Sequence, residues 1–175
     1  MHATRPLPFR TILAPVDFSL CASGALDYAA NLARASGATL VIHHATELPA
    51  GLLGSERIQP SGASLEPVRV DDYARDSARV HLAREAARLG EDLRVVTRAD
   101  IGPIVPTILA AAEEVGVDLI VIGTHGRTGL RRGLLGSVAE RVVRGARCPV
   151  LTVRIEGDCD PLSTEEHQLA TETEG

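Results

Sequence analysis

Lysine is absent from this chain, which carries its positive charge on 18 arginines. A phosphate-binding loop of the Walker type requires the sequence Gly-Lys-Ser/Thr, so the absence of lysine excludes that class of nucleotide site. Tryptophan is also absent, and the chain has only two phenylalanines and two tyrosines. A folded core must therefore be built from alanine, valine, leucine and isoleucine.

Long apolar runs and cysteine motifs are missing as well. No segment approaches the ~20 consecutive apolar residues that a membrane-spanning helix requires, so no membrane partner is expected. The first eight residues contain no apolar signal core, and the expected location is therefore cytoplasmic. The three cysteines, Cys21, Cys148 and Cys159, are far apart and lack the spacing of a metal site or a Cys-x-x-Cys motif.

The net charge of −5 is unevenly distributed along the chain. Segment 156–175 holds seven of the 23 acidic residues and no arginine, which leaves 16 acidic residues against 18 arginines in the rest of the chain. This polar segment has no hydrophobic periodicity, which predicts a disordered acidic tail. Residues 1–155 are long enough to form one domain with its own core. Their near-neutral charge gives no reason to expect a nucleic acid as a partner.

Short apolar segments alternate with amphipathic segments between residues 10 and 153. Strands are predicted at 10–16, 39–45, 93–98, 118–123 and 149–153, and helices at 20–36, 71–89, 103–115 and 137–145. This alternation is typical of a Rossmann-like α/β fold, a doubly wound open parallel five-stranded sheet with helices on both faces. Right-handed crossovers are compatible with the strand order 3-2-1-4-5. Segment 47–70 is predicted to be a long connection, either a lid or a partner surface.

A glycine-rich segment between the fourth strand and the fourth helix is a candidate anion site. It begins with Gly123-Thr-His-Gly126, continues through nine residues and ends in Gly136-Ser137. A strand, a loop of glycines and a helix start together present backbone N–H groups and the positive end of the helix dipole to an anion. Ser137 would either cap the helix or bond a phosphate oxygen. The alternative is a loop whose glycines have a structural role only.

Several polar residues occur at the ends of predicted strands. Asp17 follows the first strand, either as a helix-start acid or as a ligand residue. In the order 3-2-1-4-5 the first and fourth strands are neighbours, so Asp17 and Gly123 would open into the same crevice. His43 and His44 point to opposite faces of the second strand and are interpreted as strand-end histidines rather than a metal site. For a general base at the crevice, His125 and Asp17 are the only candidates, and His125 is alternatively a loop residue that bonds the backbone.

These features resemble the ATP-binding branch of the universal stress protein family. The glycine spacing is similar to that family's nucleotide-binding signature. Residues 12–19 resemble its first strand and acidic turn, and residues 148–153 resemble its closing strand, so the resemblance covers about residues 10–154. The additional Gly129 and Gly133 and the acidic tail depart from the plainest pattern of the family.

The resemblance implies a bound adenine nucleotide, with ATP and AMP both open, and Mg²⁺ with the nucleotide. The backbone around Pro15 and Ala45 would contact the adenine, and Asp17 would face the ribose or a phosphate-bound metal. The phosphates would be held by Gly126, Arg127, Gly136, Ser137 and Val138, and the candidate set is completed by Val16, Gly123, His125 and Gly129. The resemblance also implies a homodimer that pairs through the last strand, 149–153.

Three functions follow from these observations. The favoured one is an ATP-binding regulatory or stress-response sensor that acts through protein partners with little or no turnover. The alternatives are a slow ATPase or nucleotide hydrolase on the same scaffold, and an interaction module without nucleotide. The chain has no catalytic-triad spacing, no nucleophile elbow and no cluster of metal ligands, so no catalytic residue is assigned.

Overall fold

The computed structural model describes residues 9–59, 66–124 and 135–155. Its main sheet has five strands in the order β5-β2-β1-β6-β7. These strands are β1 (Thr11–Pro15), β2 (Thr39–Thr46), β5 (Val95–Ile101), β6 (Leu119–Gly123) and β7 (Val150–Val153). All four neighbouring pairs are parallel, which confirms the predicted order 3-2-1-4-5.

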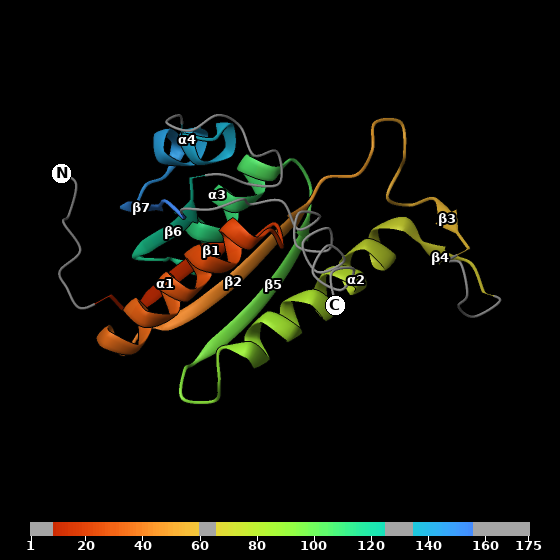
Figure 1. Ribbon diagram of the computed structural model, residues 1–175. Helices are drawn as coiled ribbons and strands as arrows, with labels where there is room; N and C mark the ends of the chain where they lie inside the picture. The colour runs from red at the N-terminus through yellow and green to blue at the C-terminus, as the bar shows by residue number, and fades with distance from the viewer. Residues whose placement is uncertain (1–8, 60–65, 125–134, 156–175) are drawn as a thin grey trace, which may run out of the picture.

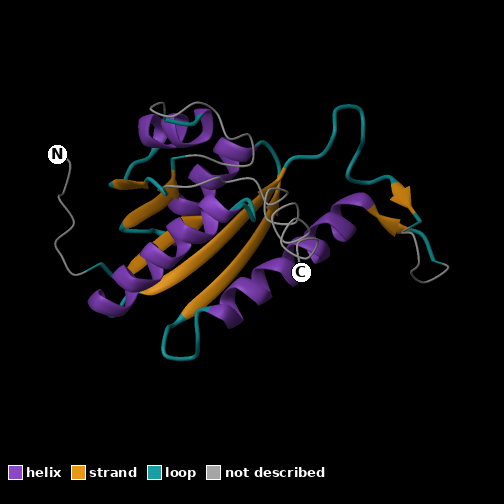
Figure 2. Ribbon diagram, in the orientation of Figure 1, coloured by secondary structure: helices purple, strands orange, loops and turns teal. Residues whose placement is uncertain are grey.

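Among the described residues, four helices cover the two faces of this sheet (Figures 1 and 2). Helices α1 (Leu20–Ser36) and α2 (Val70–Arg88) pack on one face, around a core that contains Ile12, Leu26 and Leu40. Helices α3 (Ile104–Val115) and α4 (Ser137–Gly145) pack on the other face, around Leu13, Val41 and Ile108. The fold is therefore the predicted doubly wound α/β architecture.

Single residues set both ends of α1. Ser19 is the N-cap, and its Oγ accepts a hydrogen bond from the backbone N–H of Ala22 at 3.1 Å. Gly37 follows the last helical residue with φ 69°, a left-handed conformation that glycine adopts without strain. Helix α3 ends in the same way at Gly116, with φ 68°. Serine before a helix and glycine after it are the residue types usually found at these positions.

Strand β5 is longer at its carboxyl end than the sequence indicates. The predicted strand ends at Arg98, whereas β5 runs to Ile101 because Ala45 and Thr46 of β2 still pair with Asp100 and Ile101. At α4, the N-cap is Gly136, and no side chain caps the helix. The interpretation of Ser137 as the N-cap is therefore wrong, since Ser137 is the first helical residue.

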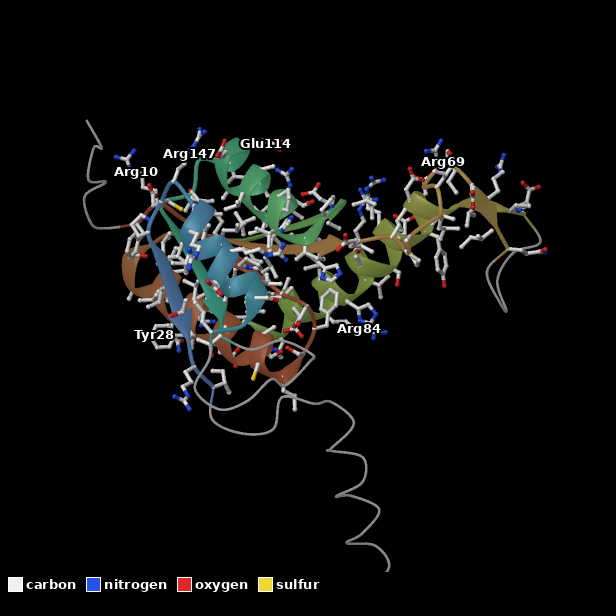
Figure 3. All side chains as sticks on the ribbon, turned by 90° about the horizontal axis from the view of Figure 1, so that it is seen from above. Arg10, Tyr28, Arg69, Arg84, Glu114 and Arg147 are labelled. Carbon is white, nitrogen blue, oxygen red and sulfur yellow. The ribbon has the colours of Figure 1, made fainter. Side chains whose placement is uncertain are left out.

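Segment 47–70 contains a small antiparallel hairpin that the sequence does not predict. It consists of β3 (Arg57–Ile58) and β4 (Val68–Arg69), which lead directly into α2. Seen from above, the hairpin with Arg69 stands away from the main sheet (Figure 3). Two-residue strands are too short to show a hydrophobic period, which explains the missed assignment.

Two further expectations concern the membrane and the ends of the domain. None of the helices in the described part of the chain is long and apolar enough to cross a membrane. The acidic segment 156–175 lies outside the described residues, so its predicted disorder stays a prediction, as does the domain boundary at residue 155.

Candidate functional site

A cavity of about 310 Å³ opens where β1, β2 and β6 end. This volume lies at the lower end of the range for small-molecule sites, roughly 300–1,000 Å³. Strands β1 and β6 are neighbours, and the chain leaves them toward opposite faces of the sheet, with α1 on one side and α4 on the other. In open α/β sheets, a crevice at such a switch point is the usual place for a ligand.

The structure brings most of the candidate residues to this cavity. Its lining includes Pro15, Val16, Asp17, Ala45, Gly123, Gly136, Ser137 and Val138. The other candidates, His125, Gly126, Arg127 and Gly129, lie outside the described residues. Thus every candidate that the structure describes lies at one cavity, although the residues come from three separate parts of the chain.

Other residues that line the cavity were not predicted to belong to the site, and His43 and His44 were interpreted only as strand-end histidines. These other lining residues are Ala22, His43, His44, Ile104, Ile108, Ile122, Thr124 and Ala139. The isoleucines belong to predicted apolar segments, but a buried stripe on a helix does not reveal whether it contacts a sheet or a cavity. The sequence did contain one sign that His43 belongs to the site. His43 lies two residues before Ala45, and residues two apart on a strand point to the same face of the sheet.

The turn between β1 and α1 fixes the position of Asp17. Its Oδ1 accepts hydrogen bonds from the Ser19 backbone N–H at 3.1 Å and from the Ser19 hydroxyl at 2.6 Å. Phe18, between them, has φ 64°, which is unfavourable for a bulky residue. Its ring stacks on His44, with the ring centroids 4.4 Å apart. Stacking and hydrogen bonds together hold the strained turn, and they keep the Asp17 carboxylate at the cavity.

The two ends of the glycine-rich segment are joined by the backbone. The N–H of Gly136 donates to the carbonyl of Thr124 at 2.8 Å, and the N–H of Thr124 donates to the carbonyl of Val153 at 2.9 Å. Helix α4 begins immediately afterwards. The N–H groups of its first residues, Ser137 and Val138, have no acceptor within the helix, because the first turn of any α-helix leaves its donors unpaired. The positive end of the α4 dipole therefore lies at the cavity.

A buried histidine contributes to the wall of the cavity. His43 is 0% exposed, and its Nε2 lies 3.1 Å from Oδ2 of Asp100 on β5. The same Oδ2 accepts a hydrogen bond from Nε of Arg98, and Arg98 also donates to Glu114 at 2.6 Å. The other ring nitrogen of His43, Nδ1, has no hydrogen-bond partner in the described part of the chain. An unpaired buried polar atom costs about 1–3 kcal/mol, so such atoms are rare in native proteins.

The surroundings of this pair determine its charge. Burial lowers the pKa of His43 and outweighs the hydrogen bond that His43 donates to Asp100, which acts in the opposite direction. Burial tends to raise the pKa of Asp100, but the hydrogen bond and charge of Arg98, together with His43, lower it overall. Near neutral pH the pair therefore consists of a neutral imidazole and an ionised carboxylate.

The described residues offer few ligands for a metal ion held by protein alone. No three histidine, cysteine, aspartate or glutamate side chains of these residues are grouped so as to hold a metal. At the cavity, the carboxylate available to a metal that arrives with a ligand is that of Asp17.

The fold and the cavity define an open α/β protein with a ligand-sized site at the switch point of its sheet. The model of the universal stress protein family matches residues 8–154, and the chain belongs to that family. Universal stress protein YxiE of Bacillus subtilis is 31% identical over 155 residues, which cover 83% of this chain and 99% of YxiE.

Other relatives match over a shorter length. Universal stress protein A homolog 2 of Coxiella burnetii is 40% identical over 92 residues, 51% of this chain and 60% of that protein. Universal stress protein MJ0531 of Methanocaldococcus jannaschii is 45% identical over 73 residues, 41% of this chain and 43% of that protein. The chain thus spans less than two thirds of these two relatives.

Solved structures share the fold. The universal stress protein UspA from Lactobacillus plantarum has a TM-score of 0.61 at 25% identity, with 85% of this chain and 100% of that chain covered. A universal stress protein solved in complex with cAMP has a TM-score of 0.62 at 25% identity, with 83% and 97% covered.

Proposed function

We propose that this chain binds an adenine nucleotide in the cavity and acts as a regulatory sensor whose protein partners respond to the bound state. The observation that carries the proposal is the meeting of Pro15, Asp17, Ala45 and the first residues of α4 at one cavity. The universal stress protein solved with cAMP supports an adenine nucleotide as the ligand class. The ATP-binding branch of the family, rather than a branch without nucleotide, is part of the proposal.

The two kinds of wall in the cavity suit the two ends of a nucleotide. Ile104, Ile108 and Ile122 provide apolar surface for a planar base. The N-terminus of α4 provides backbone N–H groups and a positive dipole for phosphate oxygens. Because the N–H of Gly136 already donates to Thr124, Gly136 would allow close approach of a phosphate rather than donate to it. In the proposal, Gly126, Arg127, Gly129 and His125 complete the phosphate site.

Asp17 would face the ribose hydroxyls or a Mg²⁺ ion bound to the phosphates. Fast phosphoryl transfer requires a positioned base, a clamped metal and stabilisation of charge on the transferred group. Among the described cavity residues, Asp17 is the sole carboxylate. Tight binding without additional transition-state contacts does not accelerate chemistry, so turnover should stay well below about 1 s⁻¹.

The first prediction tests binding. Mass spectrometry of the purified, native chain should find a co-purifying adenine nucleotide, and ATP with Mg²⁺ should raise the melting temperature of nucleotide-free protein. A ligand at 100 times its Kd adds about 2.7 kcal/mol to the free energy of unfolding. Asp17→Asn, which keeps an acceptor oxygen for Ser19, should lose most of this shift. The matched control is Asp76→Asn, because the Asp76 side chain is 70% exposed on α2, away from the cavity lining.

One outcome would correct a residue of the site, and two others would contradict the function. An unchanged ATP shift in folded Asp17→Asn would remove Asp17 from the site. A wild-type chain that neither carries nor binds any adenine nucleotide would favour the interaction module. Release of several phosphates per second, abolished in His125→Ala, would favour the hydrolase.

A further inference from the structure

We propose that His43 identifies the base of the nucleotide by accepting a hydrogen bond at Nδ1 from the exocyclic amine of adenine. This inference rests on the proposed function, because it requires a nucleotide in the cavity. It adds a specificity-determining residue that is not among the site residues predicted from the sequence. The observation behind it is a fully buried cavity residue whose second ring nitrogen has no partner among the described residues.

The hydrogen bond to Asp100 fixes which nitrogen of His43 carries the proton. An ionised carboxylate can only accept, so the contact at 3.1 Å requires a proton on Nε2. In a neutral imidazole the other nitrogen then bears a lone pair and is an acceptor. A ligand atom that meets Nδ1 must therefore be a donor.

A chain of ion pairs maintains this arrangement. Arg98 donates to the same oxygen of Asp100 that receives His43, and it extends to Glu114 at the outer side of α3, labelled in Figure 3. Strand register supports the contact, because His43 pairs with Arg98 and Ala45 pairs with Asp100 between β2 and β5. Asp100 is thus a positioning residue that acts through His43.

The requirement for a donor distinguishes between purines. Adenine carries an amine at position 6, hypoxanthine and guanine carry a carbonyl oxygen there, and unsubstituted purine carries only hydrogen. The lone pair of Nδ1 attracts the amine, repels the carbonyl oxygen and gains nothing from the unsubstituted position. Ala45 lies two residues beyond His43 on the same face of β2, so backbone contacts of a base near Ala45 would place its edge close to this ring.

The second prediction is tested by calorimetry on the full chain with ATP, ITP and purine riboside triphosphate. The wild type should bind ATP roughly two- to tenfold more tightly than purine riboside triphosphate, the range expected for one neutral hydrogen bond, and should bind ITP least well. In His43→Leu, which keeps the volume but removes the acceptor, the preference should fall toward equality while ATP still binds through its ribose and phosphates.

The matched control is Val41→Ala. Val41 is 3% exposed on the same face of β2 but does not line the cavity. This variant loses core packing but keeps the contacts proposed for the adenine base. The ratio of its affinities for ATP and purine riboside triphosphate should therefore remain that of the wild type. If His43→Leu does not fold, Asp100→Ala leaves the imidazole in place but removes the acceptor that fixes its proton, and it should also weaken the preference for ATP.

Histidine ¹⁵N NMR provides a readout that does not depend on affinity. With the His43 signal assigned from His43→Leu, the nucleotide-free protein should show a protonated Nε2 and an unprotonated Nδ1. The Nδ1 resonance should move on addition of ATP but not of purine riboside triphosphate.

The outcomes separate this inference from the proposed function. A proton on Nδ1, or an affinity ratio that is the same in wild type and in a folded His43→Leu, would overturn the role of His43 while nucleotide binding stands. If the wild type binds neither ATP nor purine riboside triphosphate, both proposals are wrong.

Discussion

At the scale of single residues, protonation of His43 would place a positive charge in a site that accepts one poorly. Asp100 on β5 favours the charged ring, whereas burial, Arg98 on β5 and His44 on β2 oppose it. The other cavity residues from α3, Ile104 and Ile108, are apolar and contribute no charge. The pKa of His43 is therefore lower in the folded chain than the value of about 6.5 that an unfolded histidine shows.

The third prediction follows from this difference. Below pH of about 6.5 the unfolded chain binds a proton at His43 that the folded chain does not, so the free energy of unfolding falls as pH decreases. The slope from this one group approaches about 1.4 kcal/mol per pH unit and ends where the folded His43 itself titrates. Urea unfolding between pH 7.5 and pH 5 should show this loss in the wild type and a smaller one in His43→Leu. Identical pH profiles for the two proteins would contradict the prediction.

The sequence alone was sufficient to place some of the site residues, but not others. Asp17 could be placed at the cavity because its position depends on local features, namely a strand end and the Ser19 cap. His43 could not be assigned, because its meaning depends on Asp100, which is 57 residues further along the chain. Asp100 itself lay beyond the predicted end of its strand. Contacts between distant residues have no local pattern, and they are where the prediction failed.

At the scale of elements, the C-terminus of α1 depends on the backbone conformation of Gly37. Its φ is 69°, and a β-carbon added there would meet no atom within 4 Å. A substitution at this position is therefore strained by the backbone alone and not by a steric clash. Helix ends of this kind could be predicted from the sequence, because Ser19, Gly37 and Gly116 act on their immediate neighbours.

The fourth prediction concerns this glycine. Gly37→Ala should lower the free energy of unfolding by about 1–2 kcal/mol, the cost of the left-handed conformation for a residue with a β-carbon. Gly37→Asn should cost less, because asparagine tolerates this conformation better. Urea denaturation of the three proteins gives the order. Equal stability of Gly37→Ala and Gly37→Asn would mean that the helix ends differently from the structure described above.

At the scale of the whole molecule, β7 is the edge strand of the sheet beside β6. The carbonyls of Pro149 and Val153 accept hydrogen bonds from Ile120 and Thr124, so these odd-numbered residues direct their backbone groups toward β6. Alternation along the strand then directs the backbone groups of Thr152 away from the sheet. An apolar edge strand with outward backbone groups is suited to pairing with another chain. We propose that it forms the homodimer that the sequence resemblance implies.

The fifth prediction uses this alternation. Thr152→Pro removes an outward N–H and keeps the hydrogen bonds between β7 and β6, since proline is tolerated at the edge of a sheet. The wild type should sediment as a dimer at micromolar concentration, and Thr152→Pro should sediment as a monomer that still binds ATP. The control is Thr107→Ala, because Thr107 lies on α3, where its hydroxyl bonds only the carbonyl of Pro103 among its described contacts. A monomeric wild type would contradict the proposed dimer.

The overall topology was predictable because it depends on the order of elements and on chirality rather than on individual contacts. Alternating strands and helices with right-handed crossovers leave few arrangements, and the observed order is the predicted one. The small hairpin β3–β4 could not be predicted, because nothing in a polar segment distinguishes it from an irregular connection.

The central position of β1 has a consequence for synthesis of the chain. Ile12 pairs with Leu40 on one side and with Leu119 on the other. Strand β1 is synthesised first, and one of its two neighbours is synthesised more than a hundred residues later. The described residues that line the cavity extend along the chain from Pro15 to Ala139, so the cavity cannot assemble before Ala139 has left the ribosome. Contacts so distant in sequence also form slowly. A ligand of this cavity could therefore stabilise only the assembled sheet, and it could not guide the early folding of the nascent chain.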